Sequence, residues 1–262
     1  MKHLSSPCFR QAGLALALAA SLTGTPALAA PDEIQVYTDD INEPGEMGLE
    51  IHTNYVTRGR DSAFYDGERP PNHVLRVTPE FSVGLAKGWD AGFYLPMAWA
   101  AGGGATLDGV KARIKRLEKN GTEEDALYYG VNLEVGYSQL RIAEHRWNAE
   151  LRGILGMEKG GWQLTANPIL GWDVSGGGKV PDVDLALKLS RKVGAGYAFG
   201  VEHYAELGAA DHLHAWRESA QSTFLVMEYE GKGWDINLGI GHGWTEPADK
   251  TTIKAIFGIP FK

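Results

Sequence analysis

The stretch Trp234-Asp-Ile-Asn-Leu-Gly-Ile-Gly-His-Gly-Trp244 shows the pattern that decides the fold. Apolar residues alternate with polar residues or glycine, so every second side chain lies on one face of an extended strand. Both ends of the stretch are tryptophan. At roughly 3.3 Å per residue and a tilt of about 40°, ten residues climb about 25 Å, the height of the apolar band between the aromatic girdles of membrane barrels. The stretch is therefore typical of a strand that crosses an outer membrane.

Two further pairs of tryptophans repeat this interval. Trp89 and Trp99 are ten residues apart, and so are Trp162 and Trp172. The alternative, a water-soluble β-protein, would bury its apolar face and scatter its large aromatic side chains through the core. Three repeats of one bilayer-sized interval favour the membrane. The residues predicted at the two membrane interfaces are Trp89, Trp99, Trp162, Trp172, Trp234 and Trp244.

The alternation extends outward from these stretches over almost the whole chain after residue 44 and divides into twelve segments. The first of them places Leu49 and Ile51 on one face and Glu50 and His52 on the other. An even number of strands is expected of a bacterial single-chain barrel. The sequence therefore predicts an all-β fold, a transmembrane antiparallel up-and-down β-barrel of about 12 strands, over residues 45–262.

The links between the segments alternate in length. Short turns that contain glycine, such as Lys87-Gly88, alternate with longer links such as residues 60–72. Bacterial barrels have short periplasmic turns and longer outer loops, so we expect the short turns on the periplasmic side. The link over residues 118–125 falls on that side yet is long and charged. The segment before it, at residues 110–115, is therefore the least well specified of the twelve.

Residues 1–29 have the organisation of a cleaved signal peptide. Lys2 and Arg10 flank a basic start, a short apolar run follows, and Ala27-Leu28-Ala29 matches an A-x-A cleavage site. The apolar run is too short to span a bilayer. Cys8 is the only cysteine and would leave with this leader, so the mature chain would contain no disulfide.

Residues 30–44 form an acidic stretch for which two interpretations remain open. It is either a tail in the periplasm or a plug inside the barrel, placed against Lys111, Arg113 and Lys115. The whole chain has 25 basic and 33 acidic residues and a net charge of −8. Such an acidic chain without a basic cluster is a poor candidate for binding nucleic acid. No run of eighteen apolar residues follows the leader, which argues against a membrane-spanning helix.

Charged residues of both signs occupy the face opposite the apolar one. Because the apolar face of a membrane barrel points to lipid, this face is predicted to line the lumen. Two interpretations predict the same residues: a channel whose charges select solutes, or a closed barrel filled by its own ion pairs. A twelve-stranded lumen is wider than one that side chains alone can fill, which favours passage. The predicted lumen-lining residues are Glu50, His52, Arg76, Glu80, Lys111, Arg113, Glu134, Glu150, Arg152, Lys188, Glu202 and Lys254.

The closing alternation Ile253-x-Ala255-x-Phe257-x-Ile259-x-Phe261 resembles the carboxy-terminal assembly signal of proteobacterial outer-membrane proteins, although Lys262 follows the usual final phenylalanine. The overall layout, with its acidic stretch and short turns, is similar to the meta-pathway phenol-degradation family of outer-membrane transporters. The resemblance implies the outer membrane of a Gram-negative cell, recognition of the last strand by the barrel-assembly machinery, and passage for a small solute. It implies no catalytic residues and no cofactor.

Three histidines are candidates for further sites. The alternation places His203 on the lipid-facing side, where a local bulge or a contact with another subunit would explain it. Outer-membrane lipid A deacylases carry a serine two residues after such a histidine, but Ala205 stands there in this chain. His212 and His214 lie in an outer loop without four evident ligands, so no metal site is predicted. We expect a porin-like channel for small solutes that is not an enzyme; the alternatives are a closed structural barrel and an outer-membrane lipid hydrolase.

Overall fold

The computed structural model describes residues 32–100, 102–122, 125–177 and 180–261. The expected signal peptide and its cleavage site lie outside these residues. Within them, no helix is long and apolar enough to cross a membrane. The strands are β1 (Met47–Arg58), β2 (Leu75–Ala86), β3 (Trp89–Tyr94), β4 (Met97–Trp99), β5 (Ala105–Leu107), β6 (Gly109–Gly121), β7 (Asp125–Ser138), β8 (Trp147–Lys159), β9 (Trp162–Asp173), β10 (Asp182–Gly194), β11 (Tyr197–Ala209), β12 (His212–Leu213), β13 (Ala220–Glu230), β14 (Asp235–Gly243) and β15 (Thr251–Phe261).

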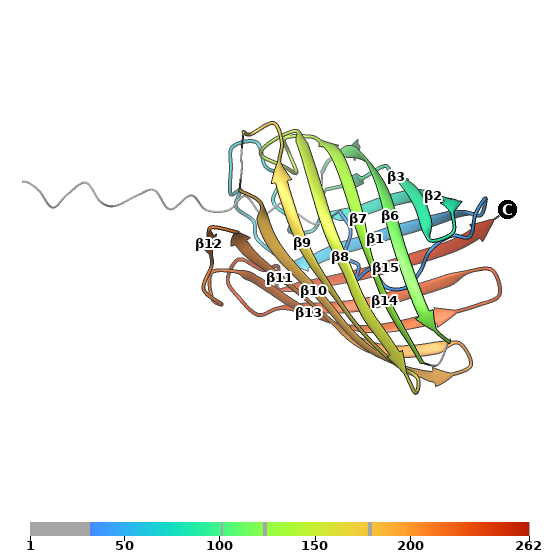
Figure 1. The fold of residues 1–262 in the computed structure, drawn as a ribbon. Helices are drawn as coiled ribbons and strands as arrows, with labels where there is room; N and C mark the ends of the chain where they lie inside the picture. The colour runs from blue at the N-terminus through green and yellow to red at the C-terminus, as the bar shows by residue number, and fades with distance from the viewer. Residues whose placement is uncertain (1–31, 101, 123–124, 178–179, 262) are drawn as a thin grey trace, which may run out of the picture.

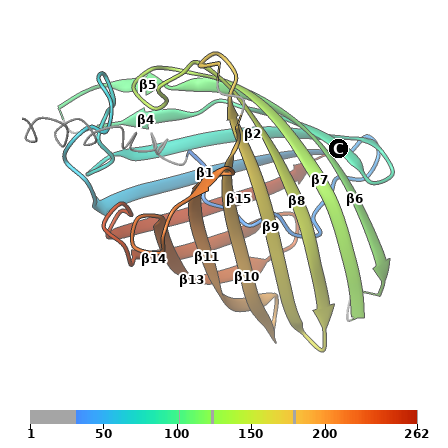
Figure 2. The same cartoon turned by 60° about the vertical axis from the view of Figure 1, so that its left-hand side comes forward.

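These strands build a closed barrel of twelve antiparallel wall strands (Figures 1 and 2). β3 and β4 both pair with β2 and act as one wall strand. On their other side, β3 pairs with β6 and β4 pairs with β5, so β5 and β6 also act as one wall strand. β12 is a short addition to β11. The first wall strand pairs with the last, as in Met47 opposite Phe261, so among the described residues no wall strand is left with an open edge. The predicted fold class is confirmed.

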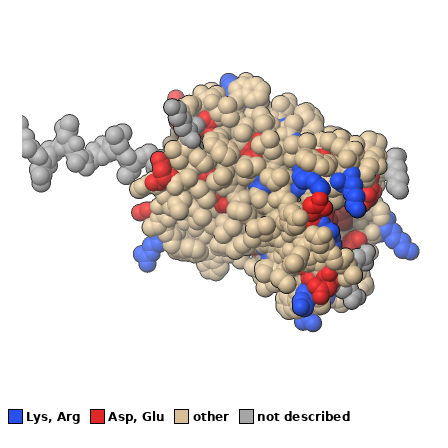
Figure 3. All heavy atoms as spheres, viewed as in Figure 1, with Lys and Arg blue, Asp and Glu red and all other residues tan. Residues whose placement is uncertain are grey.

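The outside of the barrel is apolar and the inside is polar. On β7, for example, Leu127 is 61% exposed, whereas Asn132 is fully buried. Large apolar side chains are exposed in this way on strand after strand, far beyond what a water-soluble protein leaves uncovered. Figure 3 shows a broad face with few charged residues, and the charged side chains gather towards its two ends. The predicted alternation of faces is therefore present in the structure.

The expected long link at residues 118–125 is wrong. β6 continues to Gly121 and pairs with β7 as far as Gly121 opposite Ala126, so residues 118–121 belong to the wall. The charged residues there tolerate a strand because they lie close to its end and have partners: Arg116 pairs with Glu118 on the same strand, and Lys119 pairs with Glu158 on β8 at 2.9 Å. Alternation alone underestimated this strand because its last residues are polar on both faces.

The barrel has two different ends. At one end, called the turn end, tight turns join β2 to β3, β8 to β9, and β10 to β11. Gly160 and Gly161 both have positive φ, 56° and 79°, as a two-residue turn between twisted strands requires. The opposite end, called the loop end, carries the longer connections at residues 59–74, 139–146 and 210–219.

Candidate functional site: the lumen and the segment inside it

A part of the chain lies inside the barrel. Residues 32–44, called the inner segment, run within the lumen and join β1 at the turn end. Val36 and Tyr37 are buried there. Asn167 of β9 binds the backbone of Tyr37 twice: the N–H of Tyr37 donates to Oδ1 at 2.7 Å, and Nδ2 donates to the carbonyl oxygen of Tyr37 at 2.9 Å. One amide side chain thereby satisfies the backbone groups that a neighbouring strand would otherwise bind.

Apolar packing also holds the inner segment. Ile34 packs against Phe224 of β13, and Tyr37 packs against Tyr128 of β7. The hydroxyl of Tyr37 lies 3.0 Å from that of Tyr94. Burying a large apolar side chain contributes about 1.5–3 kcal/mol, so these residues account for much of the segment's attachment.

The inner segment leaves the lumen past Gly84 of β2. The N–H of Gly45 donates to the carbonyl oxygen of Gly84 at 2.9 Å, and the N–H of Gly84 donates to the carbonyl oxygen of Glu46 at 2.9 Å. A Cβ atom at Gly84 would collide with the carbonyl group of Glu43. The close crossing of two backbones therefore requires glycine at this position.

Lys111 of β6 joins the inner segment to the wall. Its Nζ lies 3.1 Å from Asp32 and 2.9 Å from Glu33, both on the inner segment, and 3.1 Å from Glu134 on β7. All four side chains are largely or fully buried. Charged groups in such surroundings need partners, and here one ammonium group serves three carboxylates.

Arg113, two residues further along β6, holds together a second network. Its guanidinium group pairs with Glu80 at 2.6 Å and with Asp90, and its Nε donates to the hydroxyl of Tyr94 at 2.7 Å. Nζ of Lys115, which also belongs to β6, lies 3.4 Å from Oδ2 of Asp90. The basic side chains of β6 are thus fully matched by carboxylates.

Two lysines on the other side of the lumen are paired as well. Lys254 of β15 lies 2.5 Å from Glu202 of β11, and its Nζ also donates to the carbonyl oxygen of Ile34 at 2.9 Å. Lys188 of β10 pairs with Glu228 of β13. Lys254 therefore attaches the inner segment from the side opposite β6.

The structure places every residue of the predicted lumen set on the inner face of the wall. Glu50, Glu150 and Arg152 are half-buried there. The buried members are His52, Arg76, Glu80, Lys111, Arg113, Glu134, Lys188, Glu202 and Lys254. Arg76 differs from the other cations, because its buried Nε and Nη2 have no hydrogen-bond partner in the described part of the chain.

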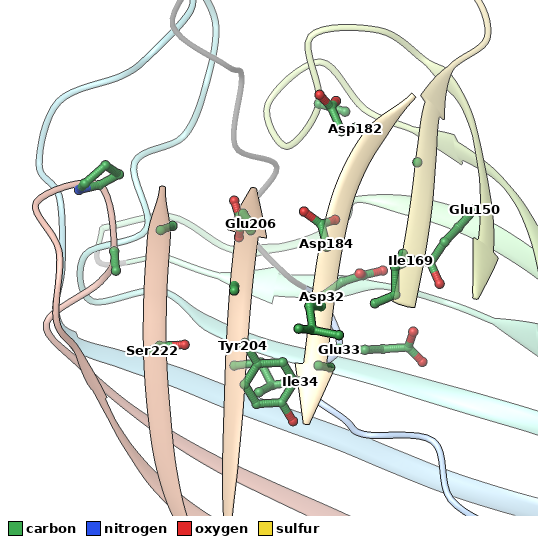
Figure 4. A pocket seen from close by; sticks show the side chains of 18 of the residues that line it. Asp32, Glu33, Ile34, Glu150, Ile169, Asp182, Asp184, Tyr204, Glu206 and Ser222 are labelled. Atoms are coloured by element: carbon green, nitrogen blue, oxygen red, sulfur yellow. The ribbon is translucent and has the colours of Figure 1, made fainter. Parts of the chain in front are cut away.

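The loop end of the lumen contains a cavity of about 410 Å³. Asp184 of β10 and Glu206 of β11 border it from neighbouring strands, directly opposite each other in the register (Figure 4). Within the described ranges, neither carboxylate has an ion-pair partner. Like charges placed opposite each other destabilise a sheet, and a cation in the cavity would relieve the repulsion. Asp249 also borders the cavity; burial raises the pKa of its carboxyl, and a backbone N–H that donates to it opposes the shift.

Ion pairs tie the connections together at the loop end. Asp108, between β5 and β6, is buried and accepts hydrogen bonds from Arg69 and from Arg141, the latter at 2.6 Å. These arginines come from two different loops. Within one of them, Arg60 and Glu68 form a two-pronged pair at 2.9 and 2.6 Å. The rim around the cavity is therefore fixed by side chains as well as by strands.

The six predicted interface tryptophans lie at the two ends of the apolar wall. Trp89, Trp162 and Trp234 lie at the turn end, and Trp99, Trp172 and Trp244 lie at the loop end. Trp172 is half-buried, and the exposed fractions of the others run from 36% at Trp99 to 60% at Trp244. At the turn end, the ring of Trp234 also contacts Tyr229 and Phe257, with centroids 5.0 and 5.9 Å apart.

His203 has a partner for each ring nitrogen. Nδ1 lies 2.9 Å from the hydroxyl of Thr223, and Nε2 lies 3.0 Å from Oε1 of Gln221. The indole of Trp216 stacks parallel to the imidazole, with centroids 6.1 Å apart. The expected bulge is wrong, because β11 and β13 pair in regular register here, with His203 opposite Thr223. Sequence reasoning missed these partners because they lie on the next wall strand and in the loop before it.

Solved structures of other outer-membrane proteins are similar to this fold, among them a channel and a porin. An outer-membrane channel from Pseudomonas putida F1 matches with a TM-score of 0.60 and 13% sequence identity, over 87% of this chain and 100% of that chain. The NanC porin matches with a TM-score of 0.53 and 12% identity, over 82% of this chain and 99% of that chain. No protein-family model matches the chain, and no curated protein sequence matches it either. The chain thus has the fold of an outer-membrane β-barrel.

Proposed function

We propose that this protein is a porin-like channel that passes small solutes across the outer membrane. Three features support the proposal: an apolar wall banded by tryptophans at both ends, a lumen lined by charges of both signs, and a cavity at the loop end. The likeness in fold to an outer-membrane channel and to a porin agrees with it. The residues we assign to the solute path are the twelve predicted lumen residues and the cavity acids Asp184 and Glu206.

One observation carries the proposal. Inside the lumen, side chains hold the inner segment, as at Tyr37, Glu33 and Ile34, and its direct backbone pairing with the wall lies at the turn end, near Gly84. Side-chain contacts can be exchanged for water or solute without breaking the sheet, whereas a paired strand cannot leave without exposing backbone groups. We therefore interpret the inner segment as a plug that narrows the passage.

Single-channel recording in planar bilayers tests this proposal. The full chain is expected to conduct weakly or intermittently, and a variant that lacks residues 32–41 is expected to conduct steadily at a higher level. Both proteins must first show the heat-modifiable migration of a folded barrel. If neither conducts, the alternative of a closed structural barrel replaces the channel.

The solute class, the location and the assembly route are parts of the same proposal. Membership of the meta-pathway phenol-degradation family rests on the acidic inner segment and the short turns, and it predicts flux of a small solute into vesicles. Export is proposed through cleavage after Ala29, which amino-terminal sequencing of protein from outer-membrane fractions checks. The last strand, β15, ends in Phe261, in agreement with recognition by the barrel-assembly machinery.

A second candidate, hydrolysis of a lipid ester on the outer wall, is favoured by the geometry at His203. A hydroxyl, an imidazole and an amide oxygen are joined in series through Thr223, His203 and Gln221, the order of nucleophile, base and orienting group in a hydrolase. Trp244 also donates to that hydroxyl, at 2.9 Å, which reduces its availability. Phospholipid hydrolysis by the purified protein that is lost in both His203→Ala and Thr223→Val would support this candidate. No hydrolysis by the folded protein would reject it.

A further inference from the structure

Three potential metal ligands converge where the inner segment meets the wall. They are His52 on β1, Glu80 on β2 and Glu33 on the inner segment. Nε2 of His52 lies 3.3 Å from Oε2 of Glu80 and 3.7 Å from Oε1 of Glu33. The ligand atoms of the three residues all lie within 4.8 Å of one another. His52 is 1% exposed and Glu80 is 3% exposed, so the group is shielded from bulk water.

The distances between these atoms fit a shared metal ion better than a hydrogen-bond network. A ring nitrogen carries at most one N–H, and a good N–H···O bond is about 2.7–3.2 Å long. Here one long hydrogen bond, between Nε2 of His52 and Oε2 of Glu80 at 3.3 Å, accounts for one carboxylate, and the carboxylates of Glu50 and Glu33 lie further from the same nitrogen, at 3.6 and 3.7 Å. Around a zinc ion with ligands at about 2.1 Å, the ligand atoms of a tetrahedron are roughly 3.4 Å apart. Oε2 of Glu80 lies 3.3 Å and Oε1 of Glu33 lies 3.7 Å from Nε2 of His52, on either side of that value.

The outer oxygens of the two carboxylates already have cationic partners. Oε1 of Glu80 pairs with Arg113 at 2.6 Å, and Oε2 of Glu33 pairs with Lys111 at 2.9 Å. The opposite oxygen of each carboxylate therefore faces the imidazole. Oε1 of Glu33 is buried and accepts no hydrogen bond from the described residues. Partners that hold the far side of a carboxylate orient it for a metal ion.

We propose that Glu33, His52 and Glu80 bind one divalent transition-metal ion, with Zn²⁺ as the best fit to one imidazole and two carboxylates. Two of the ligands belong to the wall and one belongs to the inner segment. A bound ion thus fastens the inner segment inside the lumen. The binding site stands on its own geometry, whereas an effect on solute passage rests on the proposed channel function.

Metal binding to the refolded, untagged full chain tests the site. Isothermal titration with Zn²⁺ is expected to show about one ion per chain, and Co²⁺ is expected to give the visible absorption bands of a four-coordinate site. Glu33→Gln is expected to weaken Zn²⁺ binding about 100-fold. This residue lies outside the wall strands, so the variant tests the site even if His52→Gln does not fold.

The matched control is the loop pair of His212 and His214, whose rings lie 6.4 Å apart and offer a competing site. A His212→Ala/His214→Ala variant is expected to bind Zn²⁺ as the unmodified chain does. The proposal is overturned if the folded chain binds no Zn²⁺, if Glu33→Gln binds it equally well, or if the loop variant loses the binding.

The effect on passage is measured separately. Micromolar Zn²⁺ is expected to lower the conductance of the unmodified chain and to leave Glu33→Gln unaffected. A chain that binds Zn²⁺ through Glu33 but never conducts contradicts the channel function and leaves the metal site standing. A chain that conducts but binds no Zn²⁺ supports the channel function and contradicts the metal site.

Discussion

Two regions of the lumen differ in how their charged side chains are paired. On the β6 side, Lys111 and Arg113 are each surrounded by carboxylates at ion-pair distance. On the opposite side, at the loop end of β10 and β11, Asp184 and Glu206 face each other and the cavity. The structure describes no cation within ion-pair distance of either of these two carboxylates.

This difference separates structural charges from charges that are available to a solute. Matched groups on the β6 side hold the inner segment and stabilise the folded barrel. The repulsion between the unmatched carboxylates at the loop end raises the free energy of the empty cavity. A cation that enters the cavity lowers it. Charged side chains on the inner face of the wall therefore have two distinct roles.

The largest expected effect is on the matched side. Arg113→Met leaves Glu80 and Asp90 without their guanidinium partner, and it should lower the free energy of unfolding by about 3–5 kcal/mol. Arg76→Met is the matched control, because buried nitrogens of Arg76 lack partners, and it should change stability much less. Guanidinium-induced unfolding in lipid vesicles measures both variants. Equal losses would show that burial, and not pairing, determines the stability of these arginines.

A smaller effect is expected where the inner segment meets the same network. Tyr37→Phe removes the hydroxyl that lies 3.0 Å from the hydroxyl of Tyr94, and it should lower the free energy of unfolding by about 1 kcal/mol. Tyr55→Phe is the control, because Tyr55 lies on the outer face near the loop end and the 3.3 Å hydrogen bond of its hydroxyl to His73 is exposed. An unchanged stability of Tyr37→Phe in the same unfolding assay would mean that the segment contributes nothing through this bond.

The smallest expected change in stability lies at the cavity. Asp184→Asn removes one of two opposed charges and should raise the free energy of unfolding by about 0.2–1 kcal/mol. Glu202→Gln is the contrasting variant, because Glu202 is paired with Lys254 and its loss should destabilise. If the protein conducts, the reversal potential in a salt gradient should show cation preference that Asp184→Asn reduces. Destabilisation by Asp184→Asn would contradict the idea that the carboxylate is unmatched.

The sequence predicted the wall well because each strand carries its own signal. The alternation at Leu127 and Asn132, and the tryptophans at Trp234 and Trp244, can be interpreted from a dozen residues without knowledge of the neighbours. Alternation did not predict the end of β6, because Lys119 and Asn120 are both polar and are held in the strand by pairing with β7.

The contents of the lumen could not be predicted in the same way. The inner segment depends on Asn167, Lys111 and Lys254, which belong to three separate strands that face each other only across the closed barrel. The convergence of Glu33 with His52 requires the same closure, and so does the opposition of Asp184 and Glu206. Periodicity identifies which face a residue occupies, but it does not identify its partner on another strand.

The pairing of β1 with β15 determines when the molecule becomes complete. The enclosed space does not exist until the final strand arrives, and that strand brings Lys254, which donates to the carbonyl oxygen of Ile34, 220 residues earlier in the chain. Closure of the barrel and the attachment of Ile34 by Lys254 therefore depend on the same strand. In an assembly intermediate that lacks β15, residues 32–44 would keep their contacts with β6, β9 and β13 but would lack the hydrogen bond from Lys254 to Ile34.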